Sequence, residues 1–135
     1  MTHVEEMLRT YPADLGGVDR AALVRCIEEC FDCSQTCTAC ADACLSEAGV
    51  AGLVKCVRTC LDCADICDAT GRVLSRHTGY DASLTRATLQ ACVTACGSCA
   101  GECEGHAQMH EHCRVCAQAC RRCERACQEL ISTLG

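Results

Sequence analysis

Nineteen of the 135 residues are cysteines, and they recur in runs at alternating separations of three and four. That spacing places all members of a run on one face of an α-helix, in the positions that face neighbouring helices of a bundle. There are four such runs: Cys26, Cys30, Cys33, Cys37, Cys40 and Cys44; Cys56, Cys60, Cys63 and Cys67; Cys92, Cys96, Cys99 and Cys103; and Cys113, Cys116, Cys120, Cys123 and Cys127. The chain is therefore predicted to be all-α, with thiols facing inward.

Capping residues and glycines indicate where the four helices begin and end. Asp19 is a plausible N-cap of the first helix, and Asp81 or Ser83 can cap the third. Gly79 and Gly105 are expected to end the second and third helices. The expected helices span about 19–45, 50–76, 81–104 and 109–134. Because the connections are short, consecutive helices are predicted to be antiparallel, which gives an up-down-up-down four-helix bundle.

A fifth, shorter helix is expected at the N-terminus. Val4, Met7, Leu8 and Tyr11 follow a 3-4-3 spacing, and Pro12 ends the pattern. This predicts a short amphipathic segment that packs on the bundle or on a neighbouring subunit. The chain divides accordingly into residues 1–17, a short helix and linker, and residues 18–135, the bundle.

Beyond the cysteines, the same helix face continues differently at the two ends of the bundle. Apolar side chains are expected to gather at one end as a plug; they are Leu23, Leu74, Leu89, Leu130 and Leu134. At the other end the face continues into His106, Met109 and His110, and His112 stands just beside it. Imidazole and thioether are ligands for soft metal ions, so these four residues are candidate ligands at the mouth of the core.

Composition narrows the classes of function. With one Phe and no Trp, cysteine must fill much of the interior. The net charge of −6 and the lack of a basic stripe argue against nucleic-acid binding. No stretch is apolar enough to cross a membrane, and the first residues lack a secretory signal. We therefore expect a cytoplasmic protein with reduced thiols.

The thiols suit metal ions better than disulfides. An odd number of cysteines cannot pair completely, and cysteines three or four apart on one helix have Cβ atoms about 5–6 Å apart, too far for a good disulfide. Thiolates select soft ions such as Cu(I) and Zn(II). A Zn²⁺ ion held by four thiolates carries a charge of −2, whereas Cu⁺ with one thiolate per ion is neutral. Because the core-facing positions hold no Lys or Arg, this argument favours many Cu(I) ions per chain.

These features resemble the bacterial cytosolic copper storage proteins. The resemblance rests on the four C-x-x-x-C-x-x-C runs, the missing signal peptide and the segment Gly105-His106-Ala107-Gln108-Met109-His110, and it covers essentially the whole chain. It implies a four-helix bundle that assembles into tetramers and fills its core with Cu(I). It also implies that the nineteen cysteines are core ligands and that His106, Met109 and His110 are ligands where ions come in. A copper chaperone or a small thiol is the expected donor.

Other roles for these cysteines compete with copper storage. Buried cysteines can serve simply as small apolar residues, but nineteen in one register would be a poor choice for packing alone. A less selective sink for Zn or Cd, of the metallothionein type, stays the main alternative. Iron–sulfur proteins use loop motifs followed by proline, and thiol oxidoreductases need an activated C-x-x-C at a helix N-terminus. Neither occurs here, and we expect a binding protein and not an enzyme.

Overall fold

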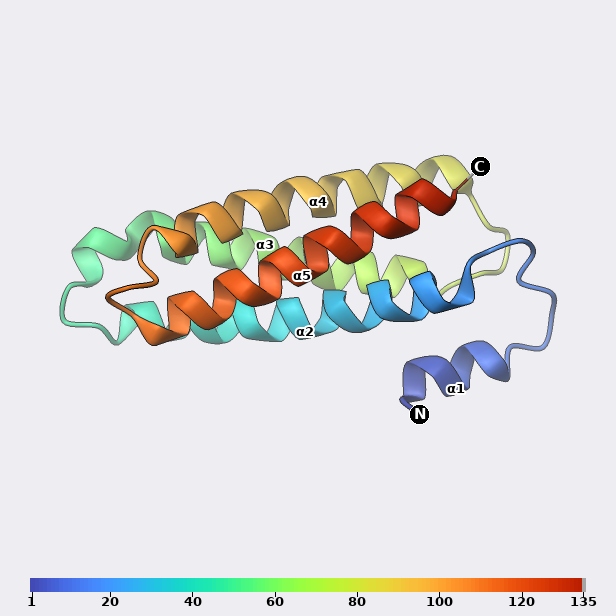
Figure 1. Ribbon diagram of the computed structural model, residues 1–135, viewed down its shortest axis with the longest axis horizontal. Helices are drawn as coiled ribbons and strands as arrows, with labels where there is room; N and C mark the ends of the chain where they lie inside the picture. Colours follow the sequence, from blue (N-terminus) through green and yellow to red (C-terminus); the bar gives the residue numbers. More distant parts are fainter. Residues whose placement is uncertain (135) are drawn as a thin grey trace.

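The computed structural model describes residues 1–134, and every regular element in that range is a helix (Figure 1). In chain order the elements are α1 (His3–Arg9), α2 (Arg20–Leu45), the 3-10 helix η1 (Val50–Leu53), α3 (Val54–Leu74), α4 (Ala82–Glu104) and α5 (Glu111–Thr133). The prediction of four long helices preceded by a short one is confirmed.

Aspartate side chains cap two of the long helices, as the sequence predicts. Oδ1 of Asp19 accepts a hydrogen bond from the backbone N–H of Ala22 at 3.1 Å, which starts α2. Oδ1 of Asp81 accepts from the N–H of Leu84 at 3.0 Å, which starts α4. Each carboxylate satisfies an N–H that has no partner within its own helix.

Two long helices begin later than predicted. Residues 50–53 form η1, in which the N–H of Gly52 donates to the carbonyl of Gly49 at 3.0 Å, because glycine disfavours a continuous α-helix there. α3 therefore begins at Val54, and it ends at Leu74, two residues early. α5 begins at Glu111 and not at residue 109, since His110 has an extended backbone with φ −134° and ψ 112°.

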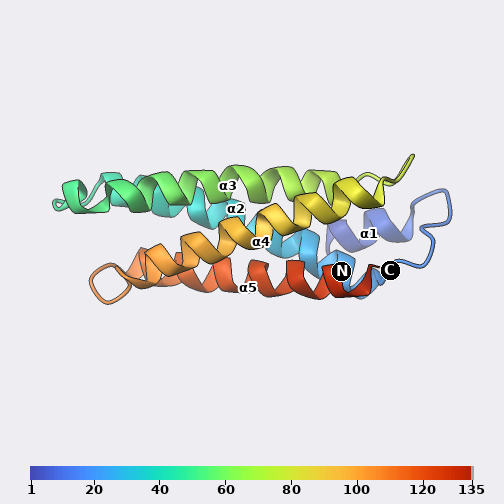
Figure 2. The ribbon, with the colours of Figure 1, turned by 90° about the horizontal axis from the view of Figure 1, so that it is seen from above.

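The four long helices form a ring in chain order. α2 contacts α3, α3 contacts α4, α4 contacts α5, and α5 returns to α2. Neighbouring helices run antiparallel, as Figure 2 shows from a second side, so the up-down-up-down topology is confirmed. The N-terminal helix α1 packs on α2. The division into residues 1–17 and 18–135 stays a prediction.

This topology gives the bundle two unlike ends. The connections α2–α3 and α4–α5 lie at one end, while the α3–α4 connection and the C-terminal end of α5 lie at the other (Figure 1). The second end, here called the leucine end, contains the buried side chains of Leu23, Leu74, Leu89 and Leu130. The first is called the histidine end, after His106, His110 and His112.

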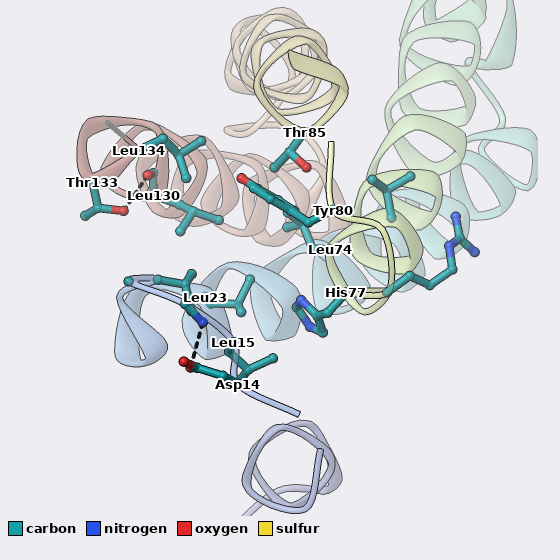
Figure 3. A pocket seen from close by; sticks show the side chains of 15 residues that line it. Asp14, Leu15, Leu23, Leu74, His77, Tyr80, Thr85, Leu130, Thr133 and Leu134 are labelled. Carbon is teal, nitrogen blue, oxygen red and sulfur yellow. Dashed lines mark hydrogen bonds between the residues drawn. The ribbon is translucent and has the colours of Figure 1, made fainter. Parts of the chain in front are cut away.

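The leucine end is packed near the thiols and hollow above them. A cavity of about 490 Å³ lies there, lined by Leu23, Leu74 and Leu130, by residues 14–18 and by the α3–α4 connection (Figure 3). Leu134, also expected in the plug, is half-buried on its wall. Within residues 1–134 no helix is both long and apolar enough to cross a membrane.

Candidate metal centre

All nineteen cysteines are free thiols in the interior of the ring. None is more than 2% exposed, and fourteen other residues complete the buried apolar set, mainly Leu and Ala at the margins of the thiol column. The prediction that cysteine fills the core is confirmed. Each helix contributes because a 3-4 spacing keeps successive side chains on the face that points at its neighbours.

The sulfur atoms form a continuous column along the bundle axis. Neighbouring Sγ atoms on different helices lie 3.5 to 4.0 Å apart, as in Cys37–Cys120 at 3.5 Å and Cys40–Cys113 at 4.0 Å. Toward the leucine end the column finishes with the Cys26–Cys127 contact at 3.6 Å. A disulfide requires about 2.05 Å between sulfurs, so these are contacts between separate thiols, at distances that one shared metal ion can bridge.

Groups of four sulfurs recur along the column and share members. In each group the four Sγ atoms lie within 4.8 Å of one another, and the groups include Cys33/Cys63/Cys67/Cys96, Cys33/Cys37/Cys63/Cys120, Cys37/Cys99/Cys116/Cys120 and Cys40/Cys60/Cys103/Cys116. Because Cys33, Cys37 and Cys116 each belong to two groups, the thiols do not divide into separate four-ligand sites. Bridging thiolates that serve several ions are the natural use of this arrangement.

Charge in the core discriminates between metals. Among the described residues the buried polar side chains are Thr70 and Thr85, and no Lys or Arg lies in the core. Distances of 3.5–4.0 Å suit any soft ion, but thiolates in excess of the metal charge would be uncompensated there. One Cu⁺ per thiolate leaves the column neutral, which is the filling that this environment tolerates best.

Two thiols at the histidine end, those of Cys44 and Cys113, are held in the protonated form by burial. Burial, assisted by neighbouring thiolates such as that of Cys56, raises the pKa of the Cys113 thiol to about 12. Burial likewise raises the pKa of Cys44. A metal ion that binds either sulfur as a thiolate would displace its proton.

At the histidine end, one imidazole reaches the sulfur column. Nδ1 of His112 lies 3.4 Å from Sγ of Cys40 and 3.7 Å from Sγ of Cys113. On the other side of the ring, Nε2 lies 2.9 Å from Oε2 of Glu47. The residue that sequence analysis placed beside the core-facing positions is thus the histidine in contact with two thiols.

The other candidate ligands surround this contact. Nδ1 of His110 lies 2.9 Å from the same Oε2 of Glu47, and its ring stacks on that of His112 with centroids 5.6 Å apart. His106 is half-buried, with Nε2 3.4 Å from Oε1 of Glu102. Met109 is 78% exposed, on the turn before α5. The structure therefore brings two of the four candidates together and leaves Met109 facing solvent.

The sequence that builds this thiol column matches a known protein family. The profile of the family described as copper storage protein matches residues 19–132, which is nearly all of the bundle. The chain belongs to the copper storage protein family. No curated protein matches it.

Solved structures agree with that family at high similarity. The copper storage protein Ccsp from Streptomyces lividans, loaded with 10 copper equivalents, is 70% identical, with a TM-score of 0.96 over 97% of this chain and 99% of that one. A second structure, which describes copper loading to a cytosolic copper storage protein from the same organism with five coppers, is 70% identical, with a TM-score of 0.87. It covers 89% of this chain and 100% of that one.

For this copper storage protein, sequence reasoning missed one residue of the histidine end. Glu47 was treated only as part of a turn, yet its carboxylate contacts both His110 and His112. The two imidazoles hold the pKa of Glu47 below its usual range, with the His112 hydrogen bond as the largest cause. A spacing rule within one helix could not find it, because Glu47 comes from the α2–α3 connection and the histidines from α4–α5.

Proposed function

We propose that this chain stores Cu(I) in the cytosol, with its nineteen cysteines as thiolate ligands along the core. The observation that carries the proposal is the continuous column of Sγ atoms 3.5–4.0 Å apart, shared between overlapping groups of four. Membership of the copper storage protein family and the similarity to copper-loaded and cytosolic relatives support it. The proposed function is sequestration of copper. The core formed by the described residues offers metal ligands and no separate group that would carry out catalysis.

Ions enter the column at the histidine end. His112 contacts the thiols of Cys40 and Cys113, His106 and His110 lie half-buried around it, and the exposed Met109 is a soft ligand that an arriving ion can reach first. At the leucine end, by contrast, apolar side chains lie between the cavity and the sulfurs. Soft ligands lie at one end and aliphatic side chains, which do not bind metal ions, lie at the other. Cu(I) therefore has one favourable entrance.

Two parts of the proposal rest on family resemblance. We expect a homotetramer, and we expect Cu(I) to be delivered by a copper chaperone or a small thiol. No role for a nucleic acid or a membrane is proposed. The competing function is a less selective sink for Zn or Cd, which would use the same thiols in four-ligand sites.

An anaerobic titration of the reduced protein with Cu(I), beside a chromophoric chelator, separates the two functions. A store gives a sharp end point near 19 ions per chain, with the chelator unloaded until then. A Zn-type sink gives about four or five ions, one per four thiolates. An end point in that lower range, or preferential binding of Zn²⁺, would contradict Cu(I) storage.

A core variant provides the matched control. Replacing Cys37, Cys99 and Cys120 with Ser keeps the shape of the side chains and removes three soft ligands. The end point should fall by about three ions if each thiolate accounts for one Cu(I), whereas Ser46→Ala, at an exposed position, should leave it unchanged. A capacity that does not respond to the core cysteines would place the copper elsewhere.

A further inference from the structure

Glu47 joins the two connections that form the histidine end. It follows Ser46, the C-cap of α2, and its Oε2 contacts Nδ1 of His110 and Nε2 of His112, each at 2.9 Å. His110 itself stands at the N-cap position of α5. The three side chains are only 16–31% exposed, so water competes weakly for these hydrogen bonds. One carboxylate therefore links residues 63 and 65 positions away in the sequence.

The chemistry of a carboxylate fixes where the ring hydrogens lie. An ionised carboxylate can only accept hydrogen bonds, so the ring nitrogen that faces it must be the one that carries hydrogen. In neutral His112 this is Nε2, which leaves the lone pair on Nδ1. In neutral His110 it is Nδ1, which leaves the lone pair on Nε2. Glu47 thus favours opposite tautomers in two stacked rings.

The tautomer of His112 determines whether the ring can bind an ion held by the outer thiols. Its Nδ1 lies 3.4 and 3.7 Å from the sulfurs of Cys40 and Cys113. With the lone pair there, the ring can donate to a Cu(I) ion that these thiolates hold. In the other tautomer Nδ1 carries hydrogen and cannot do so. Free imidazole in water exchanges between the two forms. A carboxylate fixed opposite Nε2–H therefore increases the fraction of His112 that can bind an ion through Nδ1.

We propose that Glu47 is a positioning residue for Cu(I) uptake, which holds His112 as the Nε2–H tautomer with its Nδ1 lone pair directed at the sulfurs of Cys40 and Cys113. This inference rests on the proposed function and adds a specific residue to it. Carboxylates that accept from metal-binding histidines are worth about 10–100-fold in metal affinity or activity. Loss of Glu47 should weaken capture of the first ions by that factor, and the capacity of the core should stay.

The tautomers are read in the metal-free protein. Long-range proton–nitrogen NMR at about pH 8, above the ordinary pKa of imidazole, shows which ring nitrogen carries hydrogen. Wild type should show His112 as Nε2–H and His110 as Nδ1–H, and Glu47→Ala should show averaged rings. Glu47→Gln retains an oxygen that accepts from both rings, so it should restore the wild-type pattern. Glu111→Ala, which removes an exposed charge at the same end, is the matched control.

The same four proteins are then compared in Cu(I) transfer from a chromophoric chelator. Glu47→Ala should take up the first equivalents about 10–100-fold more slowly or more weakly, whereas Glu47→Gln and Glu111→Ala should stay near wild type and all should reach the same end point. Wild-type tautomers in Glu47→Ala, or unchanged early uptake, would overturn the role of Glu47 and leave storage intact. If wild type itself binds no Cu(I), the proposed function fails, and the inference with it.

Discussion

The two ends of the bundle close the thiol column with different side chains. At the leucine end, Leu23 and Leu130 lie one turn beyond Cys26 and Cys127 and are buried. At the histidine end, α4 ends at Glu104, and His106 lies half-buried in the following turn, where it pairs with Glu102. The leucine end thus continues the helical periodicity of the core, whereas the histidine end replaces it with a turn that carries imidazoles.

The two ends are therefore expected to contribute differently, the leucine end to folding stability and the histidine end to Cu(I) uptake. Buried aliphatic side chains contribute about 1.5–3 kcal/mol each through removal from water, whereas a half-exposed imidazole contributes little packing but offers a soft ligand. We therefore expect substitutions at the leucine end to change the free energy of unfolding and those at the histidine end to change the rate of Cu(I) uptake. Each prediction below tests this division.

The largest expected effect is on stability at the leucine end. Leu89 is 0% exposed, and truncation of such a side chain to Ala costs about 2–5 kcal/mol through lost burial and the cavity that remains. Leu89→Ala should lower the free energy of unfolding of the reduced, metal-free protein by that amount in urea titration. His106→Ala should change it by about 0.5 kcal/mol or less. Equal losses at the two ends would break the comparison.

The second prediction concerns uptake at the histidine end. Replacing His106, Met109 and His110 together should slow Cu(I) uptake from a chelator about tenfold or more, because three of the four soft side chains at this end are gone. The final capacity should stay near that of wild type, since the core cysteines are untouched. Stopped-flow transfer measures the rate, and Leu134→Ala at the opposite end serves as the control. A collapse of capacity would show that these residues belong to the core sites.

Sequence reasoning was reliable where one helix determined the outcome. The spacing of Cys26 to Cys44 fixed which face of α2 is buried, and a capping aspartate at residue 19 fixed where that helix starts. Both depend on interactions a few residues apart. The order of the helices around the core followed from short connections alone.

Prediction from the sequence was weaker at the histidine end, where the α2–α3 and α4–α5 connections meet. The backbone of His110 is extended, so the helical register assumed for the segment before α5 does not hold there. As a result His112, expected just beside the core-facing positions, contacts two sulfurs, while Met109 faces solvent. The partnership with Glu47 joins separate loops, and no local pattern in the sequence encodes it.

The third prediction uses pH at the histidine end. Burial raises the pKa of Cys113 to about 12 and raises that of Cys44, above about 8.5 in an unfolded chain. The folded protein thus holds these protons more tightly, and the resulting stability is complete below pH 8.5 and is lost as pH rises toward 12. The thermal midpoint of the reduced, metal-free protein should fall over that window. Cys113→Ser should flatten the fall, and a midpoint independent of pH would contradict it.

The smallest expected effect is at the leucine end and has the opposite pH dependence. His77 lines the cavity (Figure 3), and its Nε2 is buried without a hydrogen-bond partner among residues 1–134. Its ring meets that of Tyr11 with centroids 5.4 Å apart. Burial lowers the pKa of His77, so the unfolded chain binds this proton more readily. The stability linked to His77 is therefore present above about pH 6.5 and is lost as pH falls through the lowered pKa.

Thermal unfolding between pH 7 and pH 5 tests this difference between the ends. His77→Phe keeps an aromatic ring against Tyr11 and removes the titrating group, so its midpoint should fall by less than that of wild type over this range. The difference should be a few degrees at most, because the ring is only partly buried. Acid should leave the protonation of the Cys113 thiol unchanged. If His77→Phe loses as much stability in acid as wild type, the acid-sensitive group lies elsewhere, and the two ends no longer differ in the direction of their pH response.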